Sequence, residues 1–476
     1  MTPIERSTPA ARSGRSGRAQ PAARAGAGAV SPARVCAFAV IRRVFEHAAY
    51  ADRAFTAEAA DLLPRDRALA MTLAYGTVQR RATLDHVAGR LSSRPPLELD
   101  PPVLAALRLG LFQLLCLDGV AEHAAVNESV ELAKGAQRGG EGLVNAVLRR
   151  AVREGRGILA ELDDHTAAAA AVLHSVPVWL AELWWTELGA DQSRALLRRI
   201  NEPAESALRV NTLVAERDAV LAGLPVAARP APGLPEGIIL DQPFDAHGSE
   251  LWAGGAIMPQ SRGSMLVARL LDPRPGERVL DLCAAPGAKT THLGALMHGE
   301  GRLIAVERHQ GRADALARTI ARMHVGCARV RVGDAATVDV ALEALRAARR
   351  ERGVQEGYDR VLVDPPCSGL GTLQSRPDLR WRTSPARIAE VAALQGRILR
   401  AAAMALASGG VLVYSVCTIS RVESEGVIEG FLREHQEFCA DDLGNQCETQ
   451  RPGPYLRLMP HREHTDGFFI AALRRR

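Results

Sequence analysis

The chain has 476 residues, a length that predicts two to four domains rather than one. Hydrophobic residues make up 47% of it and aromatic residues only 4%, which is ordinary for a globular protein rich in Ala and Leu. No apolar run approaches the roughly 20 residues that span a bilayer, and no secretion signal follows Met1. The eight cysteines include no C-x-x-C pair, so we expect no zinc site and no disulfide framework, and free thiols favour the reducing cytoplasm.

The positive charge is concentrated at the amino-terminal end of the chain. Residues 1–34 hold six arginines against one glutamate, which equals the formal charge of +5 of the whole chain. Residues 1–33 are rich in Ala, Gly, Pro, Ser and Arg and have no apolar period, which predicts a disordered basic tail. The remainder is close to neutral, so a nucleic-acid surface on it must be a local patch.

Residues 34–158 carry apolar side chains at helical spacing and no strand signals, which predicts an all-α domain. The most apolar helix is LAALRLGLFQLL at 104–115, after an interruption by four prolines. We expect Asn127 to cap the helix that follows and VNAVLRRAV at 144–152 to close the bundle.

Residues 159–254 predict a small α/β subdomain. A helix reaching about residue 201 precedes the strand SALRVNTL at 206–213, and a loop rich in Pro and Gly leads to a second short strand. Arg209 and Asn211 are side chains suited to phosphate or base contact. For Arg209, a solvated surface position is the stronger expectation.

In residues 255–476, apolar strands alternate with helices, and a last strand is expected near the carboxyl terminus. Residues 278–297 run from a strand through the turn CAAPGAK into a helix. Small residues let a ligand approach the backbone, and the N–H groups at a helix start favour a polar or anionic group. The spacing matches neither a P-loop nor a dinucleotide-binding fingerprint. Only Lys134 and Lys289 among the 59 basic residues are lysines, so Lys289 in the turn suggests a position that needs a compact ammonium.

Acidic residues follow successive strands of this domain: Glu307 ends one, Asp334 comes just after the next, and Asp364 follows a third. Glu307 lies twenty residues past Gly287, where a carboxylate would chelate the two hydroxyls of a ribose. For each acid alone a helix cap is the likelier role, but their repetition favours a site for an adenosine-bearing cofactor. S-adenosylmethionine fits better than NAD, because the turn has no cradle for a pyrophosphate. The alternation of strands and helices predicts a parallel, doubly wound sheet.

Two cysteines also follow strands of this domain. Cys367 lies in the turn PPCSG after Asp364, and Cys417 follows the strand GGVLVYSV. Prolines cannot continue a sheet ladder, so the first strand should end and present its next side chains at the carboxyl edge, where open α/β sheets bind ligands. Strand-end cysteines are often structural, but two beside a carboxylate indicate covalent chemistry with acid–base assistance. A helix with Glu423 and Glu425 in its first turn is expected next.

The phrases LCAAPGAKT, DPPCSGLGTL, RPDLRW, SVCT and DGFF resemble the Sun/NOL1/NOP2 family of bacterial rRNA cytosine-5 methyltransferases over about residues 170–476. LRLGLFQLL, AVNESVELAK and GLVNAVLRR resemble the NusB family of helical RNA-binding domains over most of 34–155. The resemblance implies a Rossmann-like, class I methyltransferase domain behind a NusB-like bundle and the small subdomain. It implies transfer of a methyl group from S-adenosylmethionine to C5 of a cytosine in 16S rRNA or its precursor, by a cytoplasmic monomer that binds RNA, no membrane and no metal.

The resemblance also implies roles for individual residues. Cys417 would be the nucleophile, Cys367 the thiol that assists product release, and Asp364 the group that holds the edge of the cytosine. The implied cofactor-binding residues are Cys283, Ala284, Ala285, Pro286, Gly287, Ala288, Lys289, Glu307, Asp334 and Asp364.

Three positions depart from the family pattern. Ala288 replaces a second glycine, which is acceptable only if its φ is negative. SVCT replaces the commoner TCS around Cys417. Glu307 replaces Asp, which lengthens the reach to a ribose and keeps the charge.

Three alternatives remain open from the sequence. The thiols could exchange roles, with Cys367 attacking as the prolyl-cysteine of DNA cytosine methyltransferases does. DPPC could be a relative of the DPPY motif of amino-methyltransferases, with no covalent step. The chain could also be a noncatalytic RNA-binding or antitermination factor, or its bundle could merely brace the core.

Overall fold

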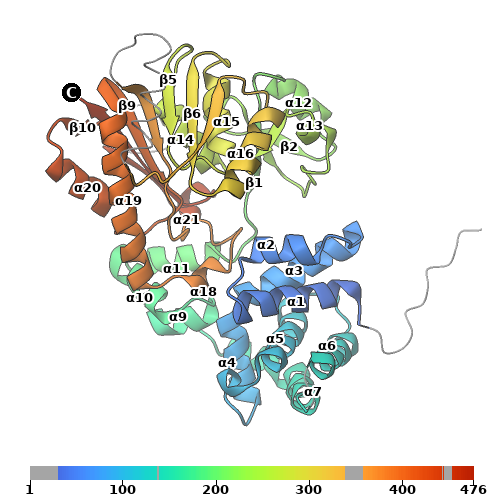
Figure 1. Ribbon diagram of the computed structural model, residues 1–476. Coiled ribbons are helices and arrows are strands. Elements are labelled where there is room, and N and C mark those ends of the chain that lie inside the picture. Colours follow the sequence, from blue (N-terminus) through green and yellow to red (C-terminus); the bar gives the residue numbers. More distant parts are fainter. Residues whose placement is uncertain (1–29, 137–138, 338–356, 442, 444–452) are drawn as a thin grey trace, which may run out of the picture.

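The computed structural model describes residues 30–136, 139–337, 357–441, 443 and 453–476. A helical bundle, a small α/β subdomain and a large α/β core follow one another along this part of the chain (Figure 1). Most of the predicted basic tail, residues 1–29, lies outside the described residues. Among the described helices, none is both long enough and apolar enough to cross a membrane.

The first unit is all-α, as predicted. Its elements are α1 Pro32–Glu46, α2 Ala51–Glu58, α3 Pro64–Gln79, α4 Arg81–Leu91, η1 Pro96–Glu98, α5 Pro101–Cys116, α6 Glu122–Ala136, α7 Glu141–Arg150, η2 Ala151–Gly155 and α8 Arg156–Ala160. Helix α5 is the centre of the bundle, because almost all of its side chains are buried and it packs against α1, α3, α4, α6 and α7. The prediction that Asn127 caps a helix is wrong, because Asn127 lies within α6. The preceding residues, EHAAV, include strong helix formers and start the helix earlier.

The second unit contains five helices and a small antiparallel sheet, and three of the helices precede the sheet. These three are α9 Ala167–Leu173, α10 Val178–Leu188 and α11 Ala190–Arg199. The sheet has the order β2-β3-β1-β4, formed by β1 Ser206–Val210, β2 Ala228–Pro230, β3 Gly237–Leu240 and β4 Ile257–Pro259, with the short helices α12 Arg217–Gly223 and α13 Glu250–Ala253. Because β4 pairs with β1, this sheet extends past residue 254, where we expected the subdomain to end.

The expected surface position of Arg209 is wrong, because its side chain is fully buried. Its guanidinium donates to Gln260 Oε1 at 2.8 Å and to Thr291 Oγ1 at 2.9 Å. Asn211 is also buried, and its amide donates to the carbonyl oxygens of Gly255 and Met323. Both residues hold the subdomain against the core, so they are not available to RNA. The apolar pattern of the sequence predicted strand β1, but it did not predict that the core covers this strand.

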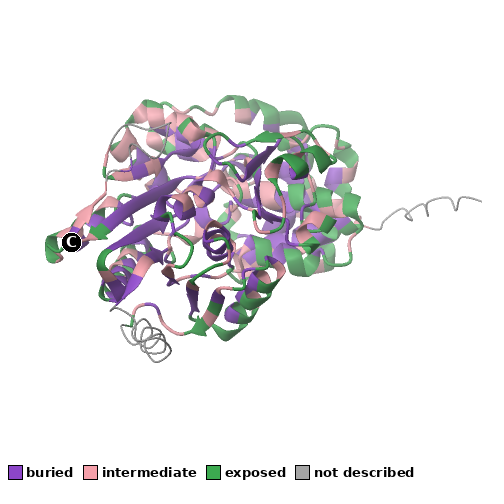
Figure 2. Ribbon diagram, turned by 90° about the horizontal axis from the view of Figure 1, so that it is seen from above, coloured by how far each residue is buried: buried purple, intermediate pink, exposed green. Residues whose placement is uncertain are grey.

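The core is built on an eight-stranded sheet with the order β10-β12-β9-β8-β5-β6-β7, and β11 also pairs with β12. Its strands are β5 Arg278–Asp281, β6 Arg302–Glu307, β7 Ala328–Val332, β8 Tyr358–Val363, β9 Leu406–Val416, β10 Phe438–Ala440, β11 Tyr455–Leu458 and β12 Phe468–Arg475. The five strands from β5 to β9 are parallel, as predicted. The expected last strand, β12, is antiparallel to β9. Figure 2 shows these strands as the buried centre of the molecule.

Helices cover both faces of this sheet, so the core is doubly wound. They are α14 Arg262–Leu271, α15 Ala288–Leu296, α16 Gln310–Arg322, α19 Pro385–Ala405 and α20 Glu425–Glu434, while the short helices α18 Leu379–Arg382 and α21 Pro460–Glu463 lie on the side of the core that faces the other two units. The chain runs from β5 outward to β6 and β7, then returns to β8 and β9 on the other side of β5. A crevice forms at such a reversal, at the carboxyl ends of the strands. The candidate site therefore lies beyond β5 and β8.

Candidate active site

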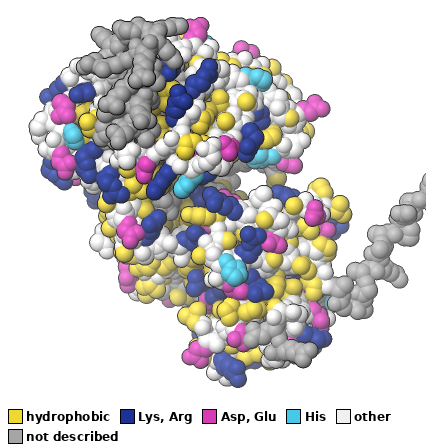
Figure 3. All heavy atoms as spheres, in the orientation of Figure 1, with side chains coloured by type: hydrophobic (Ala, Val, Ile, Leu, Met, Phe, Trp, Pro, Cys, Tyr) yellow, Lys and Arg dark blue, Asp and Glu magenta, His cyan; other side chains and the backbone are white. Residues whose placement is uncertain are grey.

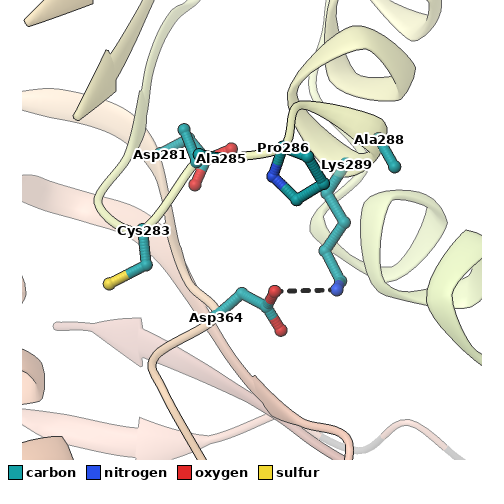
Figure 4. Close-up of a pocket in the computed structure, with 8 residues that line it drawn as sticks. Asp281, Cys283, Ala285, Pro286, Ala288, Lys289 and Asp364 are labelled. Carbon is teal, nitrogen blue, oxygen red and sulfur yellow. Dashed lines mark hydrogen bonds and ion pairs between the residues drawn. The ribbon is translucent and has the colours of Figure 1, made fainter. Parts of the chain in front are cut away.

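A pocket lies at the carboxyl ends of β5 and β8. Its lining combines the turn after β5 with two carboxylates and one ammonium group (Figure 4). The lining residues are Asp281, Cys283, Ala284, Ala285, Pro286, Ala288, Lys289 and Asp364. Ten residues were predicted to bind the cofactor. Six of them lie in the turn after β5 and line this pocket, and Asp364 is the seventh that lines it.

The turn lets a ligand approach the backbone because its residues are small. Gly287 has φ 106°, and a Cβ there would lie 2.9 Å from Leu316 Cδ1. Ala288 is the first residue of α15 and does not have a positive φ, so the replacement of a glycine here causes no backbone strain. The start of α15 thus lies at the pocket, where its first residue, Ala288, is part of the lining.

Asp281 is a pocket residue that the sequence analysis did not name. It ends β5 and is almost fully buried, and its Oδ2 accepts a hydrogen bond from Thr290 Oγ1 at 2.7 Å. Its Oδ1 has no partner among the described residues. Burial, together with the charge of Asp364, raises the pKa of Asp281 to about 7. The signal was available in the sequence, because Asp281 is a further acid at a strand end.

Lys289 and Asp364 form an ion pair at the floor of the pocket. Lys289 Nζ lies 2.8 Å from Asp364 Oδ2, as Figure 4 shows, and 5.4 Å from the centre of the Phe468 ring. Burial opposes the ammonium form, but Asp364 more than compensates and raises the pKa of Lys289. Asp364 Oδ1 accepts from Ser415 Oγ at 2.8 Å. The prediction of a compact ammonium at this position agrees with this geometry.

Glu307 and Asp334 lie at the ends of neighbouring strands, as expected, but neither is part of this lining. Glu307 Oε1 accepts from the backbone N–H of His309 at 2.9 Å, and Asp334 Oδ1 accepts from that of Ala336 at 2.9 Å. Each of these two carboxylates therefore accepts a hydrogen bond from the backbone of the turn that follows it. Their contact with an adenosine remains a prediction.

The two predicted cysteines lie side by side. Cys367 follows β8, Cys417 follows the adjacent parallel strand β9, and their sulfur atoms are 3.2 Å apart. The backbone N–H of Gly371 donates to the carbonyl oxygen of Cys417 at 3.1 Å and ties the two turns together. Two strands that end at one edge thus bring together thiols that are fifty residues apart in the sequence.

The charges around the two thiols differ. The hydrogen bond from the Cys367 thiol lowers the pKa of Cys417, and the cationic Lys289 and Arg376 add to this effect against burial and Asp364. The same hydrogen bond, burial and the carboxylates of Glu423 and Asp364 raise the pKa of Cys367 well above its usual range. The surroundings therefore favour the thiolate at Cys417 over the thiolate at Cys367.

Glu423 joins the turns that carry the two cysteines, a role that the sequence analysis missed. It precedes α20 rather than lying on it, so its expected place in the first turn of that helix is wrong. One carboxylate oxygen accepts from the backbone N–H of Ser368 at 2.7 Å and from Gln395 at 3.3 Å. The other accepts from Ser368 Oγ at 2.5 Å and from Thr418 Oγ1 at 3.4 Å. The side chain is fully buried, and burial raises its pKa.

The pocket fits the predicted cofactor. The unpartnered Oδ1 of Asp281 can accept a hydrogen bond from a ligand, and the small side chains of Ala285 and Ala288 leave the backbone of the turn open to the pocket. Asp364 and Lys289 stand between this pocket and the turns of the thiols. A methyl donor in the pocket would therefore lie beside the two sulfur atoms.

Family models match all three units of the chain. Residues 31–153 match the NusB family, residues 176–247 match the ferredoxin-like domain of the RsmF/B-like methyltransferases, and residues 268–474 match the 16S rRNA methyltransferase RsmB/F. The matched ranges agree with the bundle, the small subdomain and the core.

The chain is similar to curated proteins along most of its length. A probable ribosomal RNA small subunit methyltransferase B from Synechocystis is 36% identical over 459 residues, which covers 93% of this chain and 99% of the relative. The ribosomal RNA small subunit methyltransferase B of Thermus thermophilus is 36% identical, with coverages of 86% and 89%. The crystal structure of PH0851 superimposes with a TM-score of 0.77 at 27% identity, with coverages of 94% and 99%. The fold of Pyrococcus horikoshii NSun6 also matches, with a TM-score of 0.56 at 23% identity and coverages of 64% and 99%. The chain therefore belongs to the Sun/NOL1/NOP2 family of S-adenosylmethionine-dependent rRNA methyltransferases.

Proposed function

We propose that this protein methylates C5 of a cytosine in 16S rRNA, through a covalent bond between Cys417 and C6 of the base. The observation that carries this proposal is the 3.2 Å distance between the sulfur atoms of Cys417 and Cys367, next to the pocket that fits the methyl donor. The names of the curated relatives support small-subunit rRNA as the substrate.

Cytosine C5 is a poor nucleophile until a group adds to C6. The Cys417 thiolate supplies that group, and its attack makes C5 an enamine-like carbon. S-adenosylmethionine, when bound, supplies an electrophilic methyl group. Asp364 is placed to hold the edge of the cytosine, and Lys289 holds the Asp364 carboxyl group in position. A base inside a duplex cannot reach Cys417, so the target must be unpaired or extruded.

Release of the product breaks the bond between Cys417 and C6. A solvent water molecule takes the C5 proton, the electron pair of the C5–H bond restores the C5=C6 double bond, and the sulfur departs as a thiolate. The Cys367 thiol donates a hydrogen bond to that sulfur and so stabilises the leaving group. The enzyme then returns to its starting state, with Cys417 as thiolate and Cys367 as thiol.

The charges argue against the exchanged roles of the thiols. Cations lower the pKa of Cys417, whereas carboxylates raise that of Cys367. An amino-methyltransferase needs no second thiol at 3.2 Å, so the geometry favours the covalent route. The family membership argues against a purely noncatalytic role.

Mass spectrometry of rRNA from a deletion strain tests this function. We expect one 5-methylcytosine of 16S rRNA to disappear, to return with the wild-type gene and not to return with Cys417→Ala. Cys439→Ala, in the edge strand β10, is the matched control and should restore the mark. An unchanged inventory of 5-methylcytosine, or loss of an N-methylated base instead, would contradict the proposal.

A further inference from the structure

The segment after the Cys367 turn docks the core onto the helical bundle. Trp381 Nε1 donates to the carbonyl oxygen of Val78 at 2.7 Å, and Arg382 donates to that of Ala49 at 3.1 Å. The Arg382 guanidinium also lies 3.9 Å from the centre of the Tyr50 ring. Figure 1 shows α18, which carries this contact, between the bundle and the core. These contacts hold the corner between α1 and α2 beside the core.

Tyr50 lies at this corner and is surrounded by three arginines. Besides Arg382, the guanidinium groups of Arg53 and Arg376 lie 5.3 and 5.7 Å from the centre of its ring. Arg382 satisfies its donors on carbonyl oxygens of the bundle, so it is a bracing residue. In the part of the chain that the structure describes, neither Arg53 nor Arg376 has a carboxylate in ion-pair distance or a side-chain hydrogen bond.

Two carboxyl groups lie near this cluster. Asp52 Oδ1 accepts from the backbone N–H of Arg53 at 2.7 Å, and the buried Asp378 accepts a long hydrogen bond of 3.4 Å from the backbone N–H of Ala51. Burial raises the pKa of Asp378 above its ordinary value, which reduces the negative charge it offers. Among the described residues, neither Arg53 nor Arg376 forms an ion pair with these carboxyl groups, so the two guanidinium groups beside a partly exposed aromatic ring are complementary to an anion that also carries flat rings.

The cluster is continuous with the active site. Gly371 bonds to the carbonyl oxygen of Cys417, and the backbone N–H of Arg376 donates to that of Thr372 at 2.8 Å. One compact turn therefore leads from the thiol to the guanidinium of Arg376. Figure 3 shows that the surface is hollowed between the bundle and the core, with Lys and Arg side chains along the margin of the hollow.

We infer that Tyr50, Arg53 and Arg376 form an RNA-binding surface, on which the bundle and the core together hold the single-stranded RNA next to the target base. The two guanidinium groups bind phosphates, and the Tyr50 ring stacks on a base. The inference rests on the proposed function only in taking RNA as the substrate. It gives the bundle two separable tasks: its carbonyl oxygens anchor Trp381 and Arg382 of the core, while its Tyr50 and Arg53 contact RNA.

Binding of a fluorescein-labelled single-stranded 16S rRNA fragment to the full-length protein, without a methyl donor, tests the inference. We expect Arg53→Ala and Arg376→Ala each to weaken binding about tenfold. Each substitution should also reduce the slope of log affinity against log salt by about 0.7, the value for one phosphate contact on a single strand. Tyr50→Leu should weaken binding without changing this slope, and Tyr50→Phe should bind as the wild type does.

The matched control is Arg274→Ala, which removes an exposed arginine before β5, at the opposite edge of the sheet from the site. It should leave both affinity and salt slope unchanged. Wild-type affinity for both Arg53→Ala and Arg376→Ala would overturn the inference, as would an equal loss in Arg274→Ala or an unchanged salt slope. The binding results could follow the expected pattern for the wild type and its variants while the wild type methylates no cytosine C5. That outcome would refute the proposed function but would still support the RNA-binding surface.

Discussion

At the scale of single residues, the reactivity of Cys417 depends on its charged neighbours. The hydrogen bond from Cys367 and the ammonium of Lys289 favour its thiolate, and burial and Asp364 oppose it. A thiol attacks only as the thiolate, so the pKa of Cys417 sets the pH at which the enzyme becomes active. Lys289 thus has a role besides its ion pair with Asp364.

The rate at which iodoacetamide alkylates Cys417 should therefore depend on Lys289. In Lys289→Met the pKa of Cys417 should rise, because a stabilising cation is removed while the opposing Asp364 stays. We expect the midpoint of the pH–rate profile to move up by about one pH unit. Below that midpoint, alkylation should slow about tenfold. Peptide mass spectrometry over a pH series measures this rate at Cys417.

The other lysine of the chain provides the control. Lys134 lies on the exposed surface of α6, next to Glu131, so Lys134→Met should leave the profile as in the wild type. A profile that moves to lower pH in Lys289→Met, or that does not move, would show that Lys289 does not stabilise the thiolate.

Single residues of the site could be predicted where the strand-end pattern is strong. Acids and thiols at the ends of consecutive strands indicated Asp364, Cys367 and Cys417, because parallel strands end at one edge. The same pattern did not separate Asp281, which lines the pocket, from Glu307, which lies outside its lining. Whether an acid at a strand end lines the pocket depends on the conformation of the turn that follows it, and the apolar periodicity of the strand does not predict that conformation.

At the scale of elements, Glu423 connects the turn after β8 with the turn after β9. Its carboxylate bonds to Ser368 in one turn and to Thr418 in the other. Tyr414 in β9 donates to the carbonyl oxygen of Glu423 at 2.6 Å and fixes its backbone. The distance between the two sulfur atoms thus depends on a residue that touches neither of them.

Glu423→Ala should leave the buried N–H and the buried hydroxyl of Ser368 without the carboxylate that accepts from them. Unpaired buried donors cost about 1–3 kcal/mol each, so the free energy of unfolding should fall by about 2 kcal/mol or more. Urea unfolding measures this loss, and the pH–rate profile of Cys417 alkylation should broaden or shift because the thiol pair loosens.

Glu425→Ala is the matched control. Glu425 is two residues away and pairs with Arg457 at the start of α20. Its removal should cost less than about 1 kcal/mol and leave the Cys417 profile unchanged. Equal losses of stability in the two variants would mean that Glu423 does not join the turns.

The order of strands and helices could be predicted because apolar periodicity is local. The positions of Glu423 and Asn127 could not, because helix boundaries depend on contacts with other elements. Asn127 lies inside α6, and Glu423 lies before α20, where it is recruited by Ser368. Arg209 is a similar case: its strand was predicted, but the partners that bury it, Gln260 and Thr291, lie 51 and 82 residues away.

At the scale of the whole molecule, the bundle and the core meet at α18, directly after the turn that carries Cys367. Trp381 and Arg382 bond to carbonyl oxygens of the bundle, so the bundle is fixed next to the active site. Motif resemblance predicted both units correctly, but not the face by which they meet. The segment RPDLRW carries that contact, and the guanidinium group of its Arg376 has no hydrogen-bond acceptor among the described residues. The RNA-binding surface that we infer is thus built from two units rather than from the core alone.

The most direct test of the central claim is covalent trapping on 16S rRNA that contains 5-azacytidine. The wild-type protein should form a stable adduct whose crosslinked peptide contains Cys417, and Cys367→Ala should form it and release its normal product more slowly. Cys417→Ala should form none. An adduct on Cys367, or a trapped complex that persists in Cys417→Ala, would contradict the account.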